Sequence, residues 1–160
     1  MERVKQIMEH PLYQYHQQRI EEAEKDRIFC RHGREHALDV ARILYIQILE
    51  NGLSVKKDVV YGTALLHDIG RWEQYEKQIP HHEAGAKIAG SILAECGYTE
   101  DEIILITDAI LAHQVSDSED GQAFNALLYK ADKLSRACYK CEAKAECYWE
   151  DSKKNEFIYY

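Results

Sequence analysis

The chain has 160 residues, a formal net charge of −8 and five cysteines. Its length suits one domain with a buried core, and its acidic charge argues against nucleic acid as a partner because no large basic patch is available to neutralise phosphates. No apolar run approaches the roughly 20 residues of a membrane span, and the polar start MERVKQIMEH is unlike a signal peptide. We therefore expect a cytoplasmic protein without a membrane partner, whose cysteines stay reduced.

Apolar residues recur at helical spacing along most of the chain, whereas clean period-two alternation is missing. This pattern predicts an all-α fold, a single compact bundle of five to seven helices. The expected helices span, in chain order, residues 1–29 (one or two helices, broken near Pro11), 34–50, 56–68, 83–95, 99–113 and 122–139. The polar segments 71–80 and 114–121 are expected to be loops.

Local signals mark the position and the ends of some of these helices. Apolar side chains surround most of the helix predicted over 34–50, which indicates a central position, and Asn51-Gly52 suits its end because both residues tolerate positive φ. Thr99 followed by Glu102 three residues later predicts a capping box.

The adjacent pair His67-Asp68 follows the apolar run 64–66 and precedes Ile69-Gly70. Two polar groups at the end of a buried helix are costly unless something binds them. His36, on the predicted central helix, and Asp132, in a mostly apolar segment, are candidate partners. Two imidazoles and two carboxylates suit Mn²⁺, Fe²⁺, Zn²⁺ or Mg²⁺, and such an ion lowers the pKa of a bound water enough to make it a nucleophile at neutral pH.

The order His, then His-Asp, then a distant Asp resembles the HD-domain superfamily of metal-dependent phosphohydrolases. The matching segments are His36-Ala-Leu-Asp-Val-Ala, Ala64-Leu-Leu-His67-Asp68-Ile-Gly and Tyr129-Lys-Ala-Asp132-Lys. The resemblance implies an HD-domain-like helical fold, metal ligation by His36, His67, Asp68 and Asp132, and attack of metal-bound water on a phosphoester or phosphoanhydride bond. It covers about residues 30–136 of a single domain spanning 1–160 and leaves a cysteine-rich extension at 137–160.

Three further histidines are candidates for a second metal ion. His81 and His82 precede a predicted helix, and His113 ends the next one on its apolar face. This arrangement is similar to the branch of the superfamily that cleaves dinucleoside polyphosphates, and it favours a dinuclear centre. The competing interpretations are loop exposure for His81 and His82 and a core histidine for His113.

Basic residues near the predicted ligands are candidates for substrate binding. Arg71 follows the His-Asp pair directly, and Lys133 and Arg136 follow Asp132. A guanidinium can contact phosphate with two hydrogen bonds and balance developing charge, whereas the competing interpretation is ordinary surface charge. Asp68 could also accept the proton of the nucleophile. We therefore expect a small phosphorylated substrate, a nucleotide by resemblance only.

Four cysteines fall outside the family pattern. Cys138, Cys141 and Cys147 form C-x₂-C-x₅-C, and Cys30 lies six residues before His36. If His36 and Asp132 meet at one metal, Cys30 and Cys138 must be near each other. Three or four thiolates could then hold structural zinc or an iron–sulfur cluster, and free packed or reactive thiols are the alternative.

Two other functions remain open from the sequence. One is a regulatory protein that binds metal and nucleotide without turnover, because a fold does not fix a function. The other is an oxygenase that uses a di-iron centre on an HD-like fold. The sequence leaves the native metal, the substrate and the oligomeric state open, a homodimer included.

Overall fold

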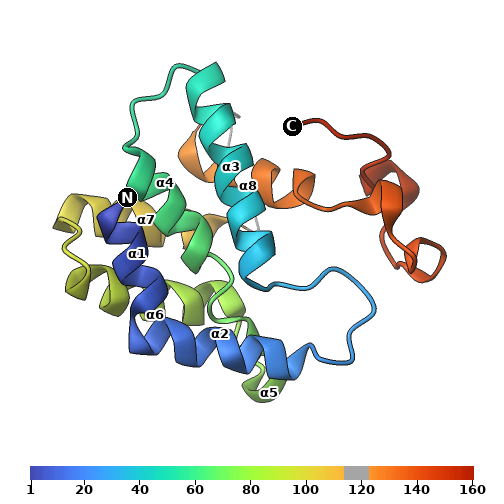
Figure 1. The fold of residues 1–160 in the computed structure, drawn as a ribbon, viewed down its shortest axis with the longest axis horizontal. Helices are drawn as coiled ribbons and strands as arrows, with labels where there is room; N and C mark the ends of the chain where they lie inside the picture. The colour runs from blue at the N-terminus through green and yellow to red at the C-terminus, as the bar shows by residue number, and fades with distance from the viewer. Residues whose placement is uncertain (114–122) are drawn as a thin grey trace.

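The computed structural model describes residues 1–113 and 123–160, and the described residues form helices, turns and loops without a strand. Figure 1 shows the helices gathered into a bundle, from which the C-terminal extension leads away beyond α8. The α-helices are α1 (Glu2–Glu9), α2 (Pro11–Ala23), α3 (Arg34–Glu50), α4 (Lys57–Leu66), α5 (Arg71–Lys77), α6 (His81–Glu95), α7 (Glu100–Ala112) and α8 (Phe124–Leu134). Three short 3₁₀ turns follow: η1 (Cys138–Lys140), η2 (Lys144–Glu146) and η3 (Asp151–Lys153). The all-α prediction is confirmed.

The helix α4 lies between two clusters of buried side chains. Leu65 and Leu66 pack into a cluster with residues of α1, α2, α6 and α7, whereas Val60 and Ala64 pack into one with residues of α3 and α8. A helix that is buried on nearly every face must be central. Because α4 ends at Leu66, the following His67 and Asp68 are held in the middle of the molecule.

The capping box at the start of α7 is confirmed. The Thr99 hydroxyl accepts a hydrogen bond from the backbone N–H of Glu102, and the Glu102 carboxylate accepts one from the backbone N–H of Thr99. After α7, two predictions lie outside the described residues: the loop over 114–121 and the start of a helix near Gln122.

The prediction of a loop over 71–80 was wrong, because residues Arg71–Lys77 form α5. Trp72 is buried, and its indole N–H donates to Nδ1 of His16 on α2 at 2.8 Å. Gln78 then takes a left-handed conformation with φ of 57° and ends the helix. A single buried side chain in seven residues leaves no periodic pattern in the sequence. The helix is held by contacts with α2 and α6.

The last predicted helix is shorter than expected, since α8 ends at Leu134 and not near Tyr139. The buried side-chain amide of Asn155 donates hydrogen bonds to the carbonyl oxygens of Lys133 and Arg136, each at 2.8 Å. These bonds satisfy backbone acceptors that a longer helix would have satisfied internally.

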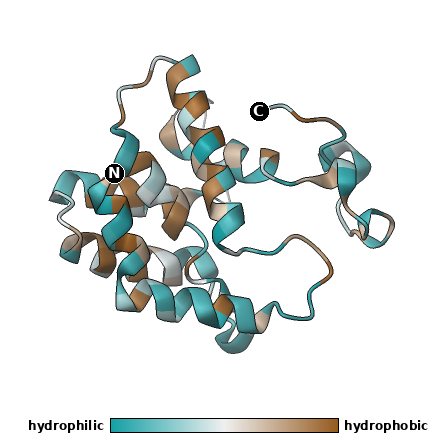
Figure 2. Cartoon of the chain, in the orientation of Figure 1, coloured by the Kyte–Doolittle hydropathy of each residue, from teal (hydrophilic) through white to brown (hydrophobic). Residues whose placement is uncertain are grey.

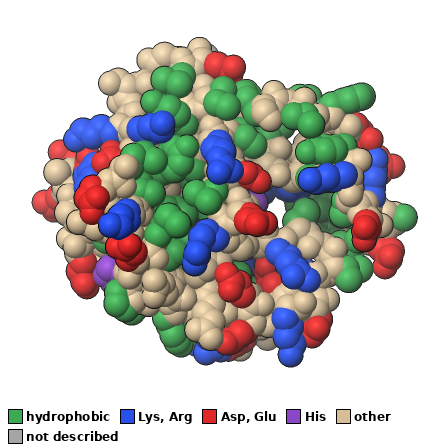
Figure 3. All heavy atoms as spheres, viewed as in Figure 1, with side chains coloured by type: hydrophobic (Ala, Val, Ile, Leu, Met, Phe, Trp, Pro, Cys, Tyr) green, Lys and Arg blue, Asp and Glu red, His purple; other side chains and the backbone are tan. Residues whose placement is uncertain are grey.

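Hydrophobic residues concentrate in the helices of the bundle, and the turns of the extension are mostly hydrophilic (Figure 2). The face in Figure 3 carries acidic and basic side chains interspersed, without a large patch of one charge. No helix among the described residues is long and apolar enough to cross a membrane.

Candidate metal centre

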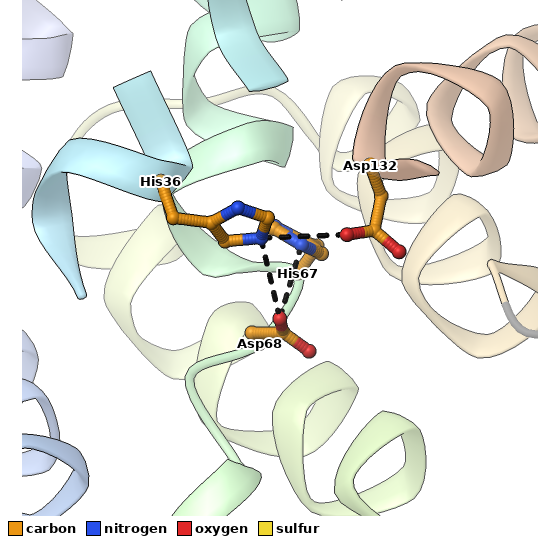
Figure 4. Close-up of side chains that lie close together, drawn as sticks. All are labelled: His36, His67, Asp68 and Asp132. Atoms are coloured by element: carbon orange, nitrogen blue, oxygen red, sulfur yellow. Dashed lines mark ion pairs between the residues drawn. The ribbon is translucent and has the colours of Figure 1, made fainter. Parts of the chain in front are cut away.

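Four side chains from three separate parts of the chain converge where α4 ends (Figure 4). His36 comes from α3, His67 and Asp68 follow α4, and Asp132 comes from α8. Nε2 of His36 lies 3.4 Å from Asp132 Oδ1 and 3.7 Å from Asp68 Oδ2, and Nε2 of His67 lies 3.3 Å from Asp68 Oδ2. One potential ligand atom from each residue lies within 4.8 Å of the others, so a single ion could touch all four.

A second group forms on the other oxygen of the same carboxylate. Nε2 of His81 and Nε2 of His113 lie 3.3 Å and 3.8 Å from Asp68 Oδ1, and 3.2 Å from each other. One potential ligand atom from each of Asp68, His81 and His113 therefore also lies within 4.8 Å of the other two. Because Asp68 belongs to both groups, it is placed to bridge two ions.

The histidine rings are oriented by bonds at their other nitrogen. This is the usual way in which proteins fix the tautomer and aim of a metal-binding imidazole. The Nδ1 partners are the carbonyl oxygens of Ala64 and Ile110 for His67 and His113, the hydroxyl of Ser135 for His36 and the side-chain oxygen of Gln74 for His81. In each case Nε2 is left facing the aspartates.

The buried donor atoms fit a divalent cation. Within the described residues, Nε2 of His36, Nε2 of His67 and Oδ2 of Asp68 are buried without a hydrogen-bond partner. Leaving such atoms unsatisfied costs about 1–3 kcal/mol each, and one bound ion would satisfy all three. Mixed nitrogen and carboxylate ligands suit Mn²⁺, Fe²⁺ or Zn²⁺.

The electrostatics of the site also favour positive charge between the carboxylates. Burial would raise the pKa of Asp68, but the charge of Arg71 and of neighbouring histidines holds it well below its usual range. Burial lowers the pKa of His36, yet the attraction of the Asp132 and Asp68 carboxylates, 3.4 Å and 3.7 Å from its Nε2, outweighs this and raises the pKa to about 9. The two buried carboxylates thus demand a cation beside them. By contrast, burial and the charge of Arg71 lower the pKa of His81 to about 3, which keeps that ring neutral and able to ligate.

A cleft of about 430 Å³ opens above the two groups. The predicted substrate-binding residues Arg71, Lys133 and Arg136 all line it, together with His81 and Asp132. Two of these basic side chains already pair with candidate ligands, Arg71 with Asp68 at 2.8 Å and Lys133 with Asp132 at 2.5 Å. The guanidinium of Arg136 lies over the ring of Trp149, 4.4 Å from its centroid.

The structure separates the two adjacent histidines that the sequence left as alternatives. His81 belongs to the second group, whereas His82 lies outside both groups, with its ring centroid 6.0 Å from that of His81. Sequence reasoning missed Gln74 and Ser135, which orient His81 and His36. No sequence signal marked them, because Gln74 fell in the segment predicted as a loop and Ser135 is an ordinary residue of a helix end.

The four cysteines of the predicted second site line one cavity. Cys30, from the loop before α3, joins Cys138, Cys141 and Cys147 of the extension there. All five cysteines of the chain are free thiols, and Cys96 is buried elsewhere in the core. Burial and then the neighbouring thiols of Cys138 and Cys141 raise the pKa of Cys30.

Comparison with known proteins agrees with this geometry. An uncharacterized protein of Clostridium beijerinckii is 44% identical over 160 residues, the whole of both chains. Ribonuclease Y of Mycoplasma mycoides is 36% identical over 100 residues, 62% of this chain and 21% of that protein. Ribonuclease Y of Nitratidesulfovibrio vulgaris is 33% identical over 109 residues, 68% of this chain and 19% of that protein. No solved structure matches significantly. The family model described as HD domain matches residues 33–144, and the chain therefore belongs to the HD domain family.

Proposed function

We propose that the protein is a metal-dependent phosphohydrolase that cleaves a phosphoester or phosphoanhydride bond of a small nucleotide at a dinuclear centre. The observation that carries the proposal is the pair of buried ligand groups that share Asp68, beside a cleft that His81, His113 and Asp132 line together with basic residues. A purely structural metal site would be closed off, whereas this one faces the cleft.

Bound divalent ions would supply an activated water and positive charge beside the reacting phosphorus. The side chains of the chain do the rest. Asp68, which its surroundings keep ionised, is placed to accept the proton of the nucleophile. Arg71 and Arg136 line the cleft and can hold phosphate oxygens through bidentate contacts. Such fixed donors stabilise the charge that develops during transfer.

The charge of the chain favours a small substrate. With a formal net charge of −8, the protein would repel a long polyanion outside the cleft. The relatives named ribonuclease Y are RNA-cleaving by name, and a phosphodiester of RNA belongs to the same chemical class. Similarity to the branch that cleaves dinucleoside polyphosphates points to a phosphoanhydride. We therefore place dinucleoside polyphosphates first among the candidate substrates.

A substrate panel under anaerobic conditions tests this proposal. The protein would be loaded with Mn²⁺ or Fe²⁺ and given dinucleoside polyphosphates, nucleoside mono- and triphosphates and a short single-stranded RNA, with products separated by chromatography. We expect turnover of at least one nucleotide, reduced by about 10³-fold or more in His67→Ala and Asp68→Ala because each variant loses several kcal/mol of metal-derived stabilisation.

The matched control is Asp39→Asn, which removes a carboxylate from the exposed side of α3, where it pairs with Arg42 at 2.8 Å. It should retain full activity. Nucleotide binding without turnover would contradict hydrolysis and favour a regulatory protein. Oxygen consumption without hydrolysis, measured in a parallel assay in air, would favour a di-iron oxygenase. Cleavage of RNA alone would contradict the small substrate.

A further inference from the structure

We propose that Cys30, Cys138, Cys141 and Cys147 hold an iron–sulfur cluster of the [4Fe–4S] type, which fixes the C-terminal extension (residues 137–160) as a wall of the cleft above the metal centre. This site is separate from the His/Asp groups and does not depend on the hydrolytic function. Four thiolate ligands are the complement that such a cluster takes.

The backbone brings the four cysteines to one place from two distant parts of the chain. The 3₁₀ turn η1 is closed by a hydrogen bond from the Cys141 N–H to the Cys138 carbonyl oxygen at 3.3 Å, and the next turn ends with one from the Cys147 N–H to the Lys144 carbonyl oxygen at 3.4 Å. On the facing loop, Arg27 Nε donates to the carbonyl oxygen of Cys30 at 2.8 Å. The four side chains then line one cavity.

No three of the four sulfur atoms lie as close together as a single zinc ion would hold them. Zinc holds four thiolates at about 2.3 Å in a tetrahedron, which sets neighbouring sulfurs about 3.8 Å apart. Throughout the described ranges 1–113 and 123–160, the sets of three or more ligand atoms within 4.8 Å are the two His/Asp groups, and no three of these sulfurs make another. A four-iron cluster separates its thiolates more widely because each sulfur binds a different iron.

Basic side chains around the cavity match the charge that the thiolates would bring. Arg136, Lys144, Lys153 and Lys154 line it with the cysteines, and the side chain of Lys154 is only 9% exposed. Four thiolates around a [4Fe–4S] core leave a net negative charge, which neighbouring lysine and arginine side chains stabilise. The charge of the cavity wall therefore suits the loaded site.

The extension also lacks a hydrophobic core that could order it. Of its residues, Ala143 and Asn155 are buried, whereas Tyr148, Phe157 and Ile158 are each 70% or more exposed. Segments of this size that bury so little apolar surface usually depend on a metal, a cluster or disulfides. The cysteines form no disulfide, so a cluster bound by them would be what orders the extension.

The cysteine cavity and the cleft share one wall. Cys30, Arg136 and Trp149 line both, and Phe29 contacts Tyr148 with ring centroids 6.1 Å apart. A cluster that joins Cys30 to the extension would therefore hold Arg136 and Trp149 at the edge of the cleft. The cluster would thus position the part of the cleft wall that Arg136 and Trp149 form.

Iron and acid-labile sulfide analysis of the full-length protein tests the proposal. The protein would be purified anaerobically, reconstituted with ferrous iron and sulfide, desalted and examined by visible absorption and by electron paramagnetic resonance after reduction. We expect about four sulfides per chain in the native protein. Cys141→Ser should lose most of this sulfide, whereas the matched control Cys96→Ala, a cysteine of the core outside the cavity, should keep it.

A third variant separates the two metal sites. His67→Ala removes iron bound by the His/Asp groups and should leave the sulfide content unchanged, because sulfide belongs to the cluster alone. Since Cys141→Ser could fail to fold, the spectra and sulfide content of the native protein by themselves decide whether a cluster is present. Iron without sulfide, zinc bound by the cysteines after loading with both metals, or sulfide retained in Cys141→Ser would each overturn the proposal.

Discussion

Asp68 offers one carboxylate oxygen to each half of the candidate metal centre. Its Oδ2 faces His36 and His67, and its Oδ1 faces His81 and His113. The two groups thus share Asp68, but each histidine belongs to one group only, so its substitution probes that group alone. The adjacent His81 and His82 provide the sharpest comparison. They differ by one position, yet His81 belongs to the second group and His82 belongs to neither.

His81→Ala should reduce the bound manganese from about two ions per chain to about one, since it removes a nitrogen ligand from the second group and leaves the first intact. His82→Ala, the matched control, should retain both ions. Manganese analysis after anaerobic loading with Mn²⁺ and desalting measures the difference, because iron at the cysteines is not counted. If His82→Ala lost an ion and His81→Ala did not, the assignment of the second group would be wrong.

At the residue scale, the sequence predicted that His36, His67, Asp68 and Asp132 come together, because histidine and aspartate residues are concentrated in recognisable motifs. It could not choose between His81 and His82, since the choice depends on where α6 begins. The helix starts at His81, two residues earlier than the predicted start at Glu83. That start lets the Gln74 side chain, from α5, hold the His81 ring, an arrangement that required a helix the sequence did not predict.

At the scale of elements, the turn after Asp68 packs unusually closely on α6. A Cβ added at Gly70 would lie 2.5 Å from the backbone nitrogen of Gly85 and 2.5 Å from the carbonyl oxygen of His81. Both obstacles are backbone atoms, so neither can rotate away. The contact sets the distance between Asp68 and the start of α6, where His81 stands.

Gly70→Ala should therefore lower the free energy of unfolding by about 1–3 kcal/mol through overpacking, and weaken the second metal ion by moving His81 away from Asp68. Urea unfolding of the metal-free protein and metal titration measure the two effects. Gly33→Ala is the matched control, because a Cβ there meets nothing within 4 Å, and it should change stability by less than about 1 kcal/mol. A fully stable Gly70→Ala variant would contradict the close packing.

The helices that the sequence predicted well are those with a continuous apolar face, such as α3 and α7. The helices that it predicted poorly depend on contacts with residues that are distant in the sequence. The helix α5 is held by Trp72 against His16, and the end of α8 is set by Asn155. Neither contact leaves a local pattern, since each joins segments separated by many residues.

At the scale of the whole molecule, one cluster of charges ties three helices together near the N-terminus. Arg3 of α1 pairs with Asp58 of α4 at 2.7 Å and with Glu102 of α7 at 2.5 Å. The hydrogen bond from Arg3, opposed in part by burial and reinforced by Lys56, lowers the pKa of Glu102 to about 2. A carboxylate with a depressed pKa stabilises the folded state above its unfolded pKa, and this contribution is lost as the pH falls.

The stability that Glu102 contributes should be complete above about pH 5 and disappear as the pH falls toward 2. Glu102→Gln should therefore be destabilised by about 1–3 kcal/mol at pH 7, and the difference from the native protein should shrink at pH 3. Denaturant unfolding at both pH values measures it. Glu100→Gln, which removes an exposed charge from the same turn, is the control. A difference that stays constant with pH would contradict the ion-pair explanation.

The position of α4 between two packed clusters has a mechanical consequence. His36 and Asp132 belong to helices of one cluster, His81 and His113 belong to or follow helices of the other, and Asp68 stands between them. Ions held by both groups would add direct links between side chains of these two clusters, which already share α4. Opening of either cluster would then release metal, so metal loading should raise the free energy of unfolding of the whole bundle.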